Sequence, residues 1–162
     1  MCRKRKPKKL EIRIVEFSGE LAPFFTRLNK AWLEKYFVVE PIDQEMLANP
    51  EKYIIANGGF IYFAKANEEI AGTFALIKID ENIYELSKMA VDEKFQGKNI
   101  GNKMLEFCLE EGKRLNAKKI ILYSNTRLEP AIHLYKKFGF KEVIIDESEY
   151  ERANIKMEIN IK

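Results

Sequence analysis

The sequence has little cysteine, little histidine and no long apolar run. Its 162 residues include two cysteines, Cys2 and Cys108, and one histidine, His133. Cys2 lies in a basic N-terminal segment and Cys108 on the apolar side of a predicted helix, where it is expected in the core, so no structural disulfide is expected. No cluster of histidine, cysteine and carboxylate residues has metal-ligand spacing, so no metal is expected. Because no run of about 18 apolar residues occurs and the basic N-terminus lacks the apolar segment of a secretory signal, we expect a cytoplasmic protein with no membrane partner.

Positive charge is concentrated at the N-terminus. The formal net charge is +3, but residues 1–9, MCRKRKPKK, contain six basic residues and no acid. Without these six, 22 of the 28 lysines and arginines remain against 25 aspartates and glutamates, so the body of the chain is slightly acidic. Nucleic-acid binding by the body is therefore not expected. We interpret residues 1–9 as a disordered, solubilising tail, with contact to nucleic acid, ribosome or an acidic partner as the alternative.

The remaining residues, 10–162, have the composition of one compact domain. The chain is 46% hydrophobic and 12% aromatic, enough for one core and too short for two. Apolar periodicity predicts strands at 10–17, on both sides of a turn at 66–69 within 60–80, and at 82–91, 118–124, 140–145 and 154–161, and helices at 21–37, 43–50, 96–116 and from about 130 to 139. This order predicts an α/β (α+β) fold with a mixed sheet and helices on its faces.

The segment from Lys88 to Phe107 changes from a strand pattern to a helix pattern through turn-forming residues. Gln96, Gly97 and Asn99 lie where the helix is expected to begin. Unpaired backbone N–H groups and the positive end of the helix dipole make such a position suitable for an anion. The phosphate-loop patterns GxxxxGK[ST] and GxGxxG do not fit the spacing here. The residues therefore indicate an anion site without saying which anion.

Three separated segments together resemble the GNAT superfamily of acetyl-CoA-dependent N-acetyltransferases. They are ELSKMAVDEKFQGKNIGNKMLE, AKKIILYSN and AIHLYKKFGFKE. The first contains a loop similar to the superfamily signature [QR]xxGx[GA], and the third fits AxxLYxxxGF through Ala131, Leu134, Tyr135, Gly139 and Phe140. The resemblance covers residues 10–161. It implies a mostly antiparallel central sheet with helices on both faces, whose fourth and fifth strands splay around CoA.

The resemblance also implies a binding site for acetyl-CoA as cosubstrate, with the pyrophosphate on the backbone N–H groups of residues 96–101. The residues implied are Met89, Ala90, Val91, Gln96, Gly97, Lys98, Asn99, Ile100, Gly101, Asn102, Lys103, Asn125, Ala131, Leu134 and Tyr135. Asn99 replaces the first glycine of the signature. Asparagine is the non-glycine residue that best adopts positive φ, so the loop is expected to form at a strain of about 1 kcal/mol. The segment NTRLEPA is longer than the family pattern, which leaves the role of Asn125 on the pantetheine arm open.

Two residues match catalytic positions of the superfamily. A base is needed because an alkylamine with a pKa near 10 is mostly protonated at pH 7. Glu85 matches a glutamate base used by some members, directly or through a water, although it could also be a solvated strand-end carboxylate. Tyr135 matches a tyrosine placed near the sulfur as general acid, or else it packs the short helix. Backbone N–H groups near Ala90 and Val91 match the oxyanion site, whereas His133, about 200° around the helix from Tyr135, is expected at the surface.

The acceptor is expected between the first predicted helix, residues 36–59 and the hairpin. Aromatic and acidic residues in this region, one of whose carboxylates could hold a cationic amine, are Trp32, Tyr36, Tyr53, Glu40, Asp43 and Glu45. A primary amine of a small molecule, including an amino-acid-like metabolite, is the favoured acceptor, and the N-terminus or a lysine of a protein is the alternative. A non-catalytic CoA-binding regulatory module is the alternative of another class. Both monomer and homodimer are compatible with the sequence.

Overall fold

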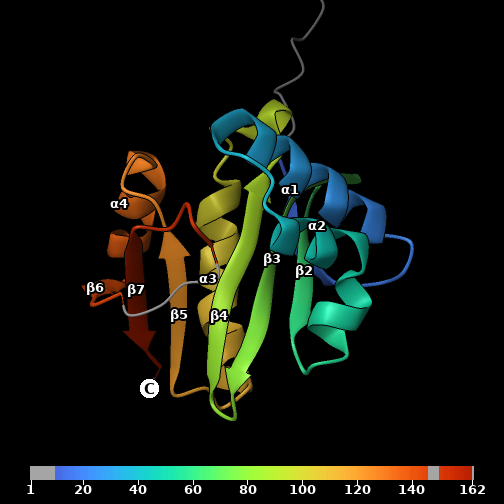
Figure 1. Cartoon of the computed structure of the whole chain (residues 1–162). Helices are drawn as coiled ribbons and strands as arrows, with labels where there is room; N and C mark the ends of the chain where they lie inside the picture. Colours follow the sequence, from blue (N-terminus) through green and yellow to red (C-terminus); the bar gives the residue numbers. More distant parts are fainter. Residues whose placement is uncertain (1–9, 146–149, 162) are drawn as a thin grey trace, which may run out of the picture.

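The fold is built on a seven-stranded sheet with helices between and around its strands. A computed structural model of the chain describes residues 10–145 and 150–161 (Figure 1). The strands are β1 (Ile12–Glu16), β2 (Phe60–Ala66), β3 (Glu69–Asp80), β4 (Ile83–Val91), β5 (Lys119–Ser124), β6 (Lys141–Val143) and β7 (Ile155–Asn160). The helices are α1 (Ala22–Tyr36), α2 (Pro41–Ala48), α3 (Ile100–Arg114) and α4 (Glu129–Lys137), with a π-helical turn η1 (Glu51–Ile55) and a 3-10 turn η2 (Glu93–Phe95). The predicted order of strands and helices is confirmed.

The sheet is mixed and mostly antiparallel, as the resemblance implies. Its strand order is β1-β2-β3-β4-β5-β7-β6, and β4–β5 is the one parallel pair among the described strands. Because parallel neighbours need a crossover, α3 connects β4 to β5. The strands β1 to β4 follow one another as an antiparallel meander, in which β2 and β3 join through a tight turn at Asn67 and Glu68.

The two parallel strands separate partway along their length. Pairing runs from Ile83 opposite Lys119 to Leu86 opposite Leu122 and ends there. Both strands continue beyond that point, β4 to Val91 and β5 to Ser124. The last part of β4 therefore has no ladder partner on its β5 side, which confirms the predicted splay of the fourth and fifth strands.

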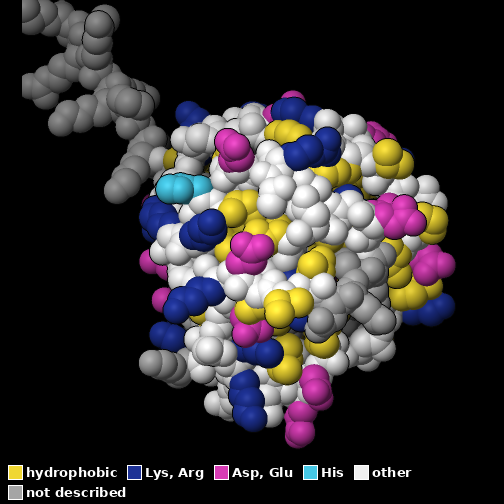
Figure 2. Space-filling model, turned by 60° about the vertical axis from the view of Figure 1, so that its left-hand side comes forward, with side chains coloured by type: hydrophobic (Ala, Val, Ile, Leu, Met, Phe, Trp, Pro, Cys, Tyr) yellow, Lys and Arg dark blue, Asp and Glu magenta, His cyan; other side chains and the backbone are white. Residues whose placement is uncertain are grey.

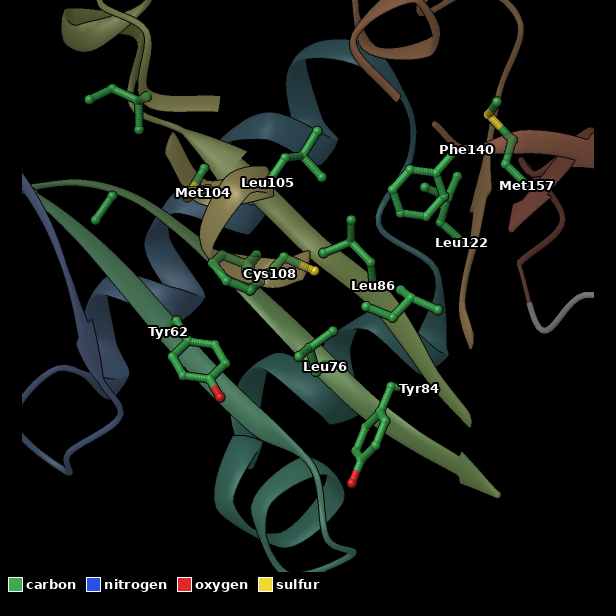
Figure 3. Packing of buried hydrophobic residues seen from close by; sticks show 14 of the residues in the cluster. Tyr62, Leu76, Tyr84, Leu86, Met104, Leu105, Cys108, Leu122, Phe140 and Met157 are labelled. Atoms are coloured by element: carbon green, nitrogen blue, oxygen red, sulfur yellow. The ribbon is translucent and has the colours of Figure 1, made fainter. Parts of the chain in front are cut away.

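Helices cover both faces of the sheet. On one face, α3 packs through Met104, Leu105 and Cys108 against Tyr62 and Leu86 of the sheet (Figure 3). On the other face, α1 and α2 pack against alternate residues of the same strands (Figure 1). Cys108 has no exposed surface, so its predicted place in the core is confirmed, and burial raises the pKa of its thiol to about 12.

Several element boundaries differ from the sequence prediction. The helix predicted at 96–116 begins at Ile100, because Gly97 and Asn99 have left-handed backbone angles that a helix cannot contain. The strand predicted at 140–145 is reduced to β6, and η1 was not predicted. Gly139, with a φ of 102°, follows the end of α4 as predicted.

Two predictions concern the N-terminal tail and the membrane. Residues 1–9, predicted to be a tail, lie outside the described residues. Within residues 10–145 and 150–161, no helix is both long and apolar enough to cross a bilayer.

Candidate functional site

The turn between β4 and α3 has the backbone conformation predicted for an anion site. Gly97 has a φ of 75° and Asn99 a φ of 69°, which confirms that Asn99 can stand in for glycine here. The N–H groups of the first turn of α3 have no intrahelical acceptor, and the Asn99 side chain makes no capping hydrogen bond. Residues 96–99 before the helix are exposed, Ile100 is buried, and Gly101 and Asn102 are half-buried.

The two signature segments contact each other in space. A Cβ atom added to Gly101 would lie 3.2 Å from Cδ2 of Leu134, so the absence of a side chain lets α3 and α4 approach. The Nζ atom of Lys137 in α4 donates to Oδ1 of Asn102 in α3 at 3.0 Å. Segments about 30 residues apart in the sequence thus form one corner beside the open part of β4.

A pocket lies where β4 and β5 separate, with about 750 Å³ of empty space including its open mouth. Five of the predicted site residues line it: Glu85, Met89, Asn125, Ala131 and Tyr135. The other predicted residues lie outside its lining. Ala90 is buried beside β3, and Val91 and Gln96 line a second hollow against α1. Residues 97–103 form the α3 corner, on which Leu134 packs.

Glu85 is buried in the wall of this pocket. Its residue exposure is 7%, and its backbone lies between Ile77 of β3 and Ile121 of β5. Electrostatic contacts link it to Lys88 and Tyr150. The structure therefore does not place Glu85 as a solvated strand-end carboxylate, because it is enclosed and lines the pocket.

Tyr135 lines the pocket from α4, and Glu85 lines it from β4. Its ring packs edge-on against Phe140 with 6.0 Å between centroids. Burial, with a smaller contribution from Cys108, raises the pKa of its hydroxyl to about 12. The hydroxyl thus keeps its proton throughout the neutral range.

Asn125 uses both polar atoms of its side chain to hold the loop after β5. Its Nδ2 atom donates to the carbonyl of Arg152 at 2.7 Å, and its Oδ1 atom accepts from the N–H of Arg127 at 2.9 Å. These bonds tie the longer segment before α4 to the segment before β7, so Asn125 shapes this part of the pocket.

A β-bulge in β4 explains the lysine in the middle of a central strand. Thr73 of β3 faces Ala90 and Ala75 faces Ser87, so Lys88 and Met89 together oppose one residue of β3. Lys88 has a φ of 53°, a strained value for this residue type. The extra residue interrupts the alternation of side chains along β4. The Lys88 side chain therefore points toward α2, where it contacts Asp43.

Lys88 belongs to a buried network of charges. Its Nζ atom donates to Oδ1 of Asp43 at 2.7 Å, and the two side chains are 3% and 0% exposed. Arg152 donates to both carboxylate oxygens of Asp43, at 2.7 and 2.9 Å, and to Glu40 at 2.6 Å. Burial raises the pKa of Asp43, but hydrogen bonds from Arg152 and the charge of Lys88 outweigh it and hold this pKa below its usual value. Burial lowers the pKa of Lys88, against the opposing effect of Asp43.

The acceptor region differs from the sequence expectation. Glu40 and Asp43 were expected as candidates to hold an amine, but the network above already occupies both carboxylates. Glu45 is exposed on α2 and, like Tyr36 and Tyr53, lies outside the pocket lining, whereas Trp32 lines the pocket.

The residues of the pocket wall that sequence reasoning missed include the polar side chains of Asn29, Tyr150 and Arg152. Asn29 was detectable as a polar residue on the apolar side of a predicted helix, where it is 2% exposed. Tyr150 and Arg152 gave no local signal, because a segment between two strands has no periodicity that tells where its side chains point.

Other candidates take no part in the pocket. His133 is exposed on α4, as predicted, and the single histidine is visible at the surface on the side that Figure 2 shows. Basic and acidic side chains are interspersed on that side. Among the residues that the structure describes, no three histidine, cysteine or carboxylate side chains are grouped to hold a metal ion.

Comparison with known proteins agrees with this geometry. A sequence profile described as the acetyltransferase (GNAT) family matches residues 24–140. The chain belongs to the GNAT acetyltransferase family. It is 32% identical to an uncharacterized N-acetyltransferase of Bacillus subtilis, YvbK, over 66% of this chain and 71% of that protein. It is 30% identical to the N-acetylaspartate synthetase of Xenopus tropicalis, over 72% of this chain and 38% of that longer protein.

Solved structures share the fold of this GNAT chain. An acetyltransferase of the GNAT family from Staphylococcus aureus has a TM-score of 0.84 and 25% identity, covering 94% of this chain and all of that one. An acetyltransferase from Salmonella typhimurium, solved with acetyl-CoA, has a TM-score of 0.74 and 15% identity over 93% and 94% of the two chains. The GNAT fold, the enzyme class N-acetyltransferase and acetyl-CoA as cosubstrate are thereby established at the level of the family.

Replacing Asn99 by glycine should leave acetyl-CoA affinity equal or slightly better. Glycine adopts the observed φ of 69° without strain, and the N–H groups of the turn are unchanged. Calorimetric titration with acetyl-CoA measures the effect. Asn99→Ala, which keeps the strain and loses the amide, serves as the comparison and should lower stability by about 1 kcal/mol. A large loss of affinity in Asn99→Gly would mean that the amide side chain contacts the ligand.

Proposed function

We propose that this GNAT enzyme transfers the acetyl group of acetyl-CoA directly to the primary amine of a small molecule. The observation that supports this most is that the opening between β4 and β5 brings Glu85 and Tyr135 to one pocket. These residues come from opposite sides of the opening and differ in acidity, as a base and an acid in one reaction must. The strand order alone would not require Glu85 and Tyr135 to line the same pocket.

The residues of the β4–α3 corner fit the anionic part of acetyl-CoA. Left-handed Gly97 and Asn99 turn the chain into α3. The N–H groups of Gln96 and Lys98 bond to carbonyls of the preceding turn, whereas the N–H groups of the first turn of α3 have no intrahelical acceptor and can hold an anion. Beyond Leu86, strand β4 has N–H groups that no β5 residue accepts, and Met89 faces the pocket there. Acetyl-CoA supplies an activated acyl group, and the open edge of β4 supplies donors that can hold its carbonyl oxygen.

Glu85 acts as the base in this proposal. An amine enters the pocket mostly protonated and must lose a proton before it can attack. Glu85 lines the pocket from β4, where it can take that proton directly or through an ordered water. Its enclosure keeps the carboxylate away from bulk solvent, so the proton transfer takes place beside the reacting amine.

Tyr135 acts as the proton donor to the sulfur in this proposal. Tyr135→Phe should lower turnover by about tenfold, less than usual for general acid catalysis, because a thiol with a pKa near 8.5 leaves fairly well without a proton. The steady-state rate of thiol release measures it, and phenylalanine keeps the packing on Phe140. Unchanged turnover would show that Tyr135 serves only to pack α4.

The acceptor side of the pocket favours a small molecule over a protein chain. Leu33 and Asn29 of α1, which line it, are each 2% exposed. A recessed wall of this kind can contact a small molecule that enters the pocket, whereas the surface of a folded protein substrate cannot reach it as easily. The name of the Xenopus relative makes aspartate one candidate acceptor, and polyamines, other amino acids and peptide amines complete a first panel.

Two measurements together test the proposed function. Calorimetry with acetyl-CoA and CoA reports binding, and thiol release over the panel of amines and peptides reports transfer. We expect binding of both and release with at least one small amine. Release with peptides alone would favour a protein acetyltransferase, and binding without release on any acceptor would favour a regulatory CoA-binding module.

A further inference from the structure

The wall of the pocket that faces α1 is largely aromatic. Trp32, Leu33 and Phe37 contribute from α1, and Tyr150 contributes from the segment before β7. We call these four residues the acceptor wall. The Trp32 and Phe37 rings pack together with 5.8 Å between centroids. Such a wall favours apolar substituents, because each group that it covers leaves water.

The basic side chains of the pocket are already engaged by carboxylates of the protein. Among the described lining residues, Lys88 and Arg152 are the two cations. Lys88 donates to Asp43 at 2.7 Å, and Arg152 is bidentate on Asp43 and also bonded to Glu40. Both cations also lie over the Tyr150 ring: Nζ of Lys88 is 4.4 Å and Cζ of Arg152 is 4.6 Å from its centroid.

The charges of this network leave no cation for an acceptor. Two carboxylates, Asp43 and Glu40, offset two cations when Lys88 is protonated. If burial deprotonates Lys88, the network is negative rather than neutral. In either state a carboxylate on the acceptor would have to displace Asp43 or Glu40, and buried, bidentate contacts are hard to displace.

The acid in the pocket lining is Glu85, and its negative charge suits a cationic amine on the acceptor. Among the described residues that line the pocket, it is the only carboxylate. It faces the position where an amine must lose its proton under the proposed function. The pocket therefore has one acid, which itself interacts with Lys88 and Tyr150, together with an aromatic wall and two cations held by Asp43 and Glu40.

We propose that the acceptor is an apolar primary amine, carrying an aromatic or alkyl substituent and no carboxylate. This inference rests on the proposed function, and it narrows the expected class, which included amino-acid-like metabolites. The amine lies toward Glu85 and the substituent lies against the acceptor wall. An amino acid of the same size is disfavoured because carboxylates of the protein already hold both cations that line the pocket, Lys88 and Arg152. Arg127 lies over the Phe37 ring and donates to the carbonyl of Tyr36, but it is outside the pocket lining.

Matched acceptors test the proposal. Phenethylamine is compared with phenylalanine, and tryptamine is compared with tryptophan. The amides of the two amino acids, which lack the carboxylate charge, are controls of similar size, and aspartate is included. The measurement is kcat/KM from thiol release at saturating acetyl-CoA. We expect each amine to exceed its amino acid by more than tenfold, and each amide to exceed its amino acid. Because the α-amino group of an amino acid has a lower pKa than an alkylamine, reactivity alone would favour the amino acid over the matched amine. The amide has a lower pKa than its amino acid, so these two are compared at a pH above both pKa values, where an advantage of the amide reports the missing carboxylate.

A variant connects the preference to the network. Glu40→Gln removes one of the two carboxylates on Arg152 and leaves Asp43 in place, so the ratio of amine to amino acid should fall several-fold. Glu34→Gln, an exposed acid on α1 beside Leu33, should leave the ratio unchanged. Thermal melting shows whether both variants fold. The comparison of acceptors with the wild-type enzyme does not depend on the variants.

The possible failures are distinguishable. Higher kcat/KM for amino acids or aspartate than for the matched amines would overturn the inference and leave the acetyltransferase proposal intact. A ratio that stays the same in folded Glu40→Gln would overturn the role of the network. Acetyl-CoA binding without thiol release on any acceptor would instead refute the proposed function itself.

Discussion

Glu85→Gln should lower kcat/KM for amine acceptors by about 10²- to 10⁴-fold at neutral pH, the usual contribution of a general base. Glutamine keeps the size of the side chain and its place in the pocket wall but cannot take a proton. The part of the pH dependence that reports ionisation of Glu85 should also flatten, whereas the dependence on the fraction of amine that is already neutral remains. Thiol release measured from pH 6 to pH 10 checks both effects.

Two comparisons make this result specific to Glu85. Glu81→Gln changes an exposed acid in the turn before β4 and should leave kcat/KM and the pH profile unchanged. Calorimetry should give the same acetyl-CoA affinity for wild type and Glu85→Gln, because Glu85 lies away from the β4–α3 corner. A pH profile of Glu85→Gln that overlays the wild-type profile would remove Glu85 from the role of base.

Asp43→Asn should lower the free energy of unfolding by about 3 to 5 kcal/mol, the typical cost of breaking a buried ion pair on one side. The Asp43 side chain has no exposed surface and accepts hydrogen bonds from Lys88 and Arg152. Asparagine leaves these two cations with insufficient negative charge in a buried place. Urea unfolding followed by fluorescence measures the change, and Glu45→Gln on the exposed side of α2 should change it by less than about 0.5 kcal/mol.

The effect of Asp43 should depend on pH in a defined direction. The pKa of Asp43 in the folded protein is below its usual value, so its stabilisation is fully present above the unfolded pKa of about 3.9. It is lost as the pH falls through the lower, folded value. The stability difference between wild type and Asp43→Asn should therefore be constant near pH 7 and shrink below about pH 4. A difference that persists unchanged in acid would show that Asp43 acts through packing and not through its charge.

The predicted fold and corner rested on local rules that hold wherever the elements lie. Alternation of apolar and polar residues placed β1, and apolar runs bounded by turn residues placed β2 to β5 within a few residues. The positive φ of Asn99 was expected because asparagine is the non-glycine residue that best adopts this conformation. The β4–α3 boundary was less accurate, because helical spacing of apolar residues continues into a turn that the backbone angles of Gly97 and Asn99 prevent from being helical.

The acceptor side could not be read in the same way. Lys88 stood out in the sequence as a charge within an apolar strand, but the bulge that directs it toward α2 depends on how β3 and β4 pair. Asp43 and Glu40 had the composition of an amine site, and only their contact with Arg152, more than 100 residues later, shows that they neutralise cations instead.

The sequence by itself determined the order of strands and helices, the GNAT signatures, the anion corner and the candidates Glu85 and Tyr135. These features depend on neighbours within a few residues or on segments whose spacing is characteristic. Only the tertiary structure decided that Glu85 and Tyr135 share one pocket, that Asn125 holds a loop, and that the pocket cations are neutralised. The reason is physical: burial and charge compensation are properties of groups that meet in space, and the chain brings α2, the β4 bulge and the segment before β7 together only when the sheet has formed.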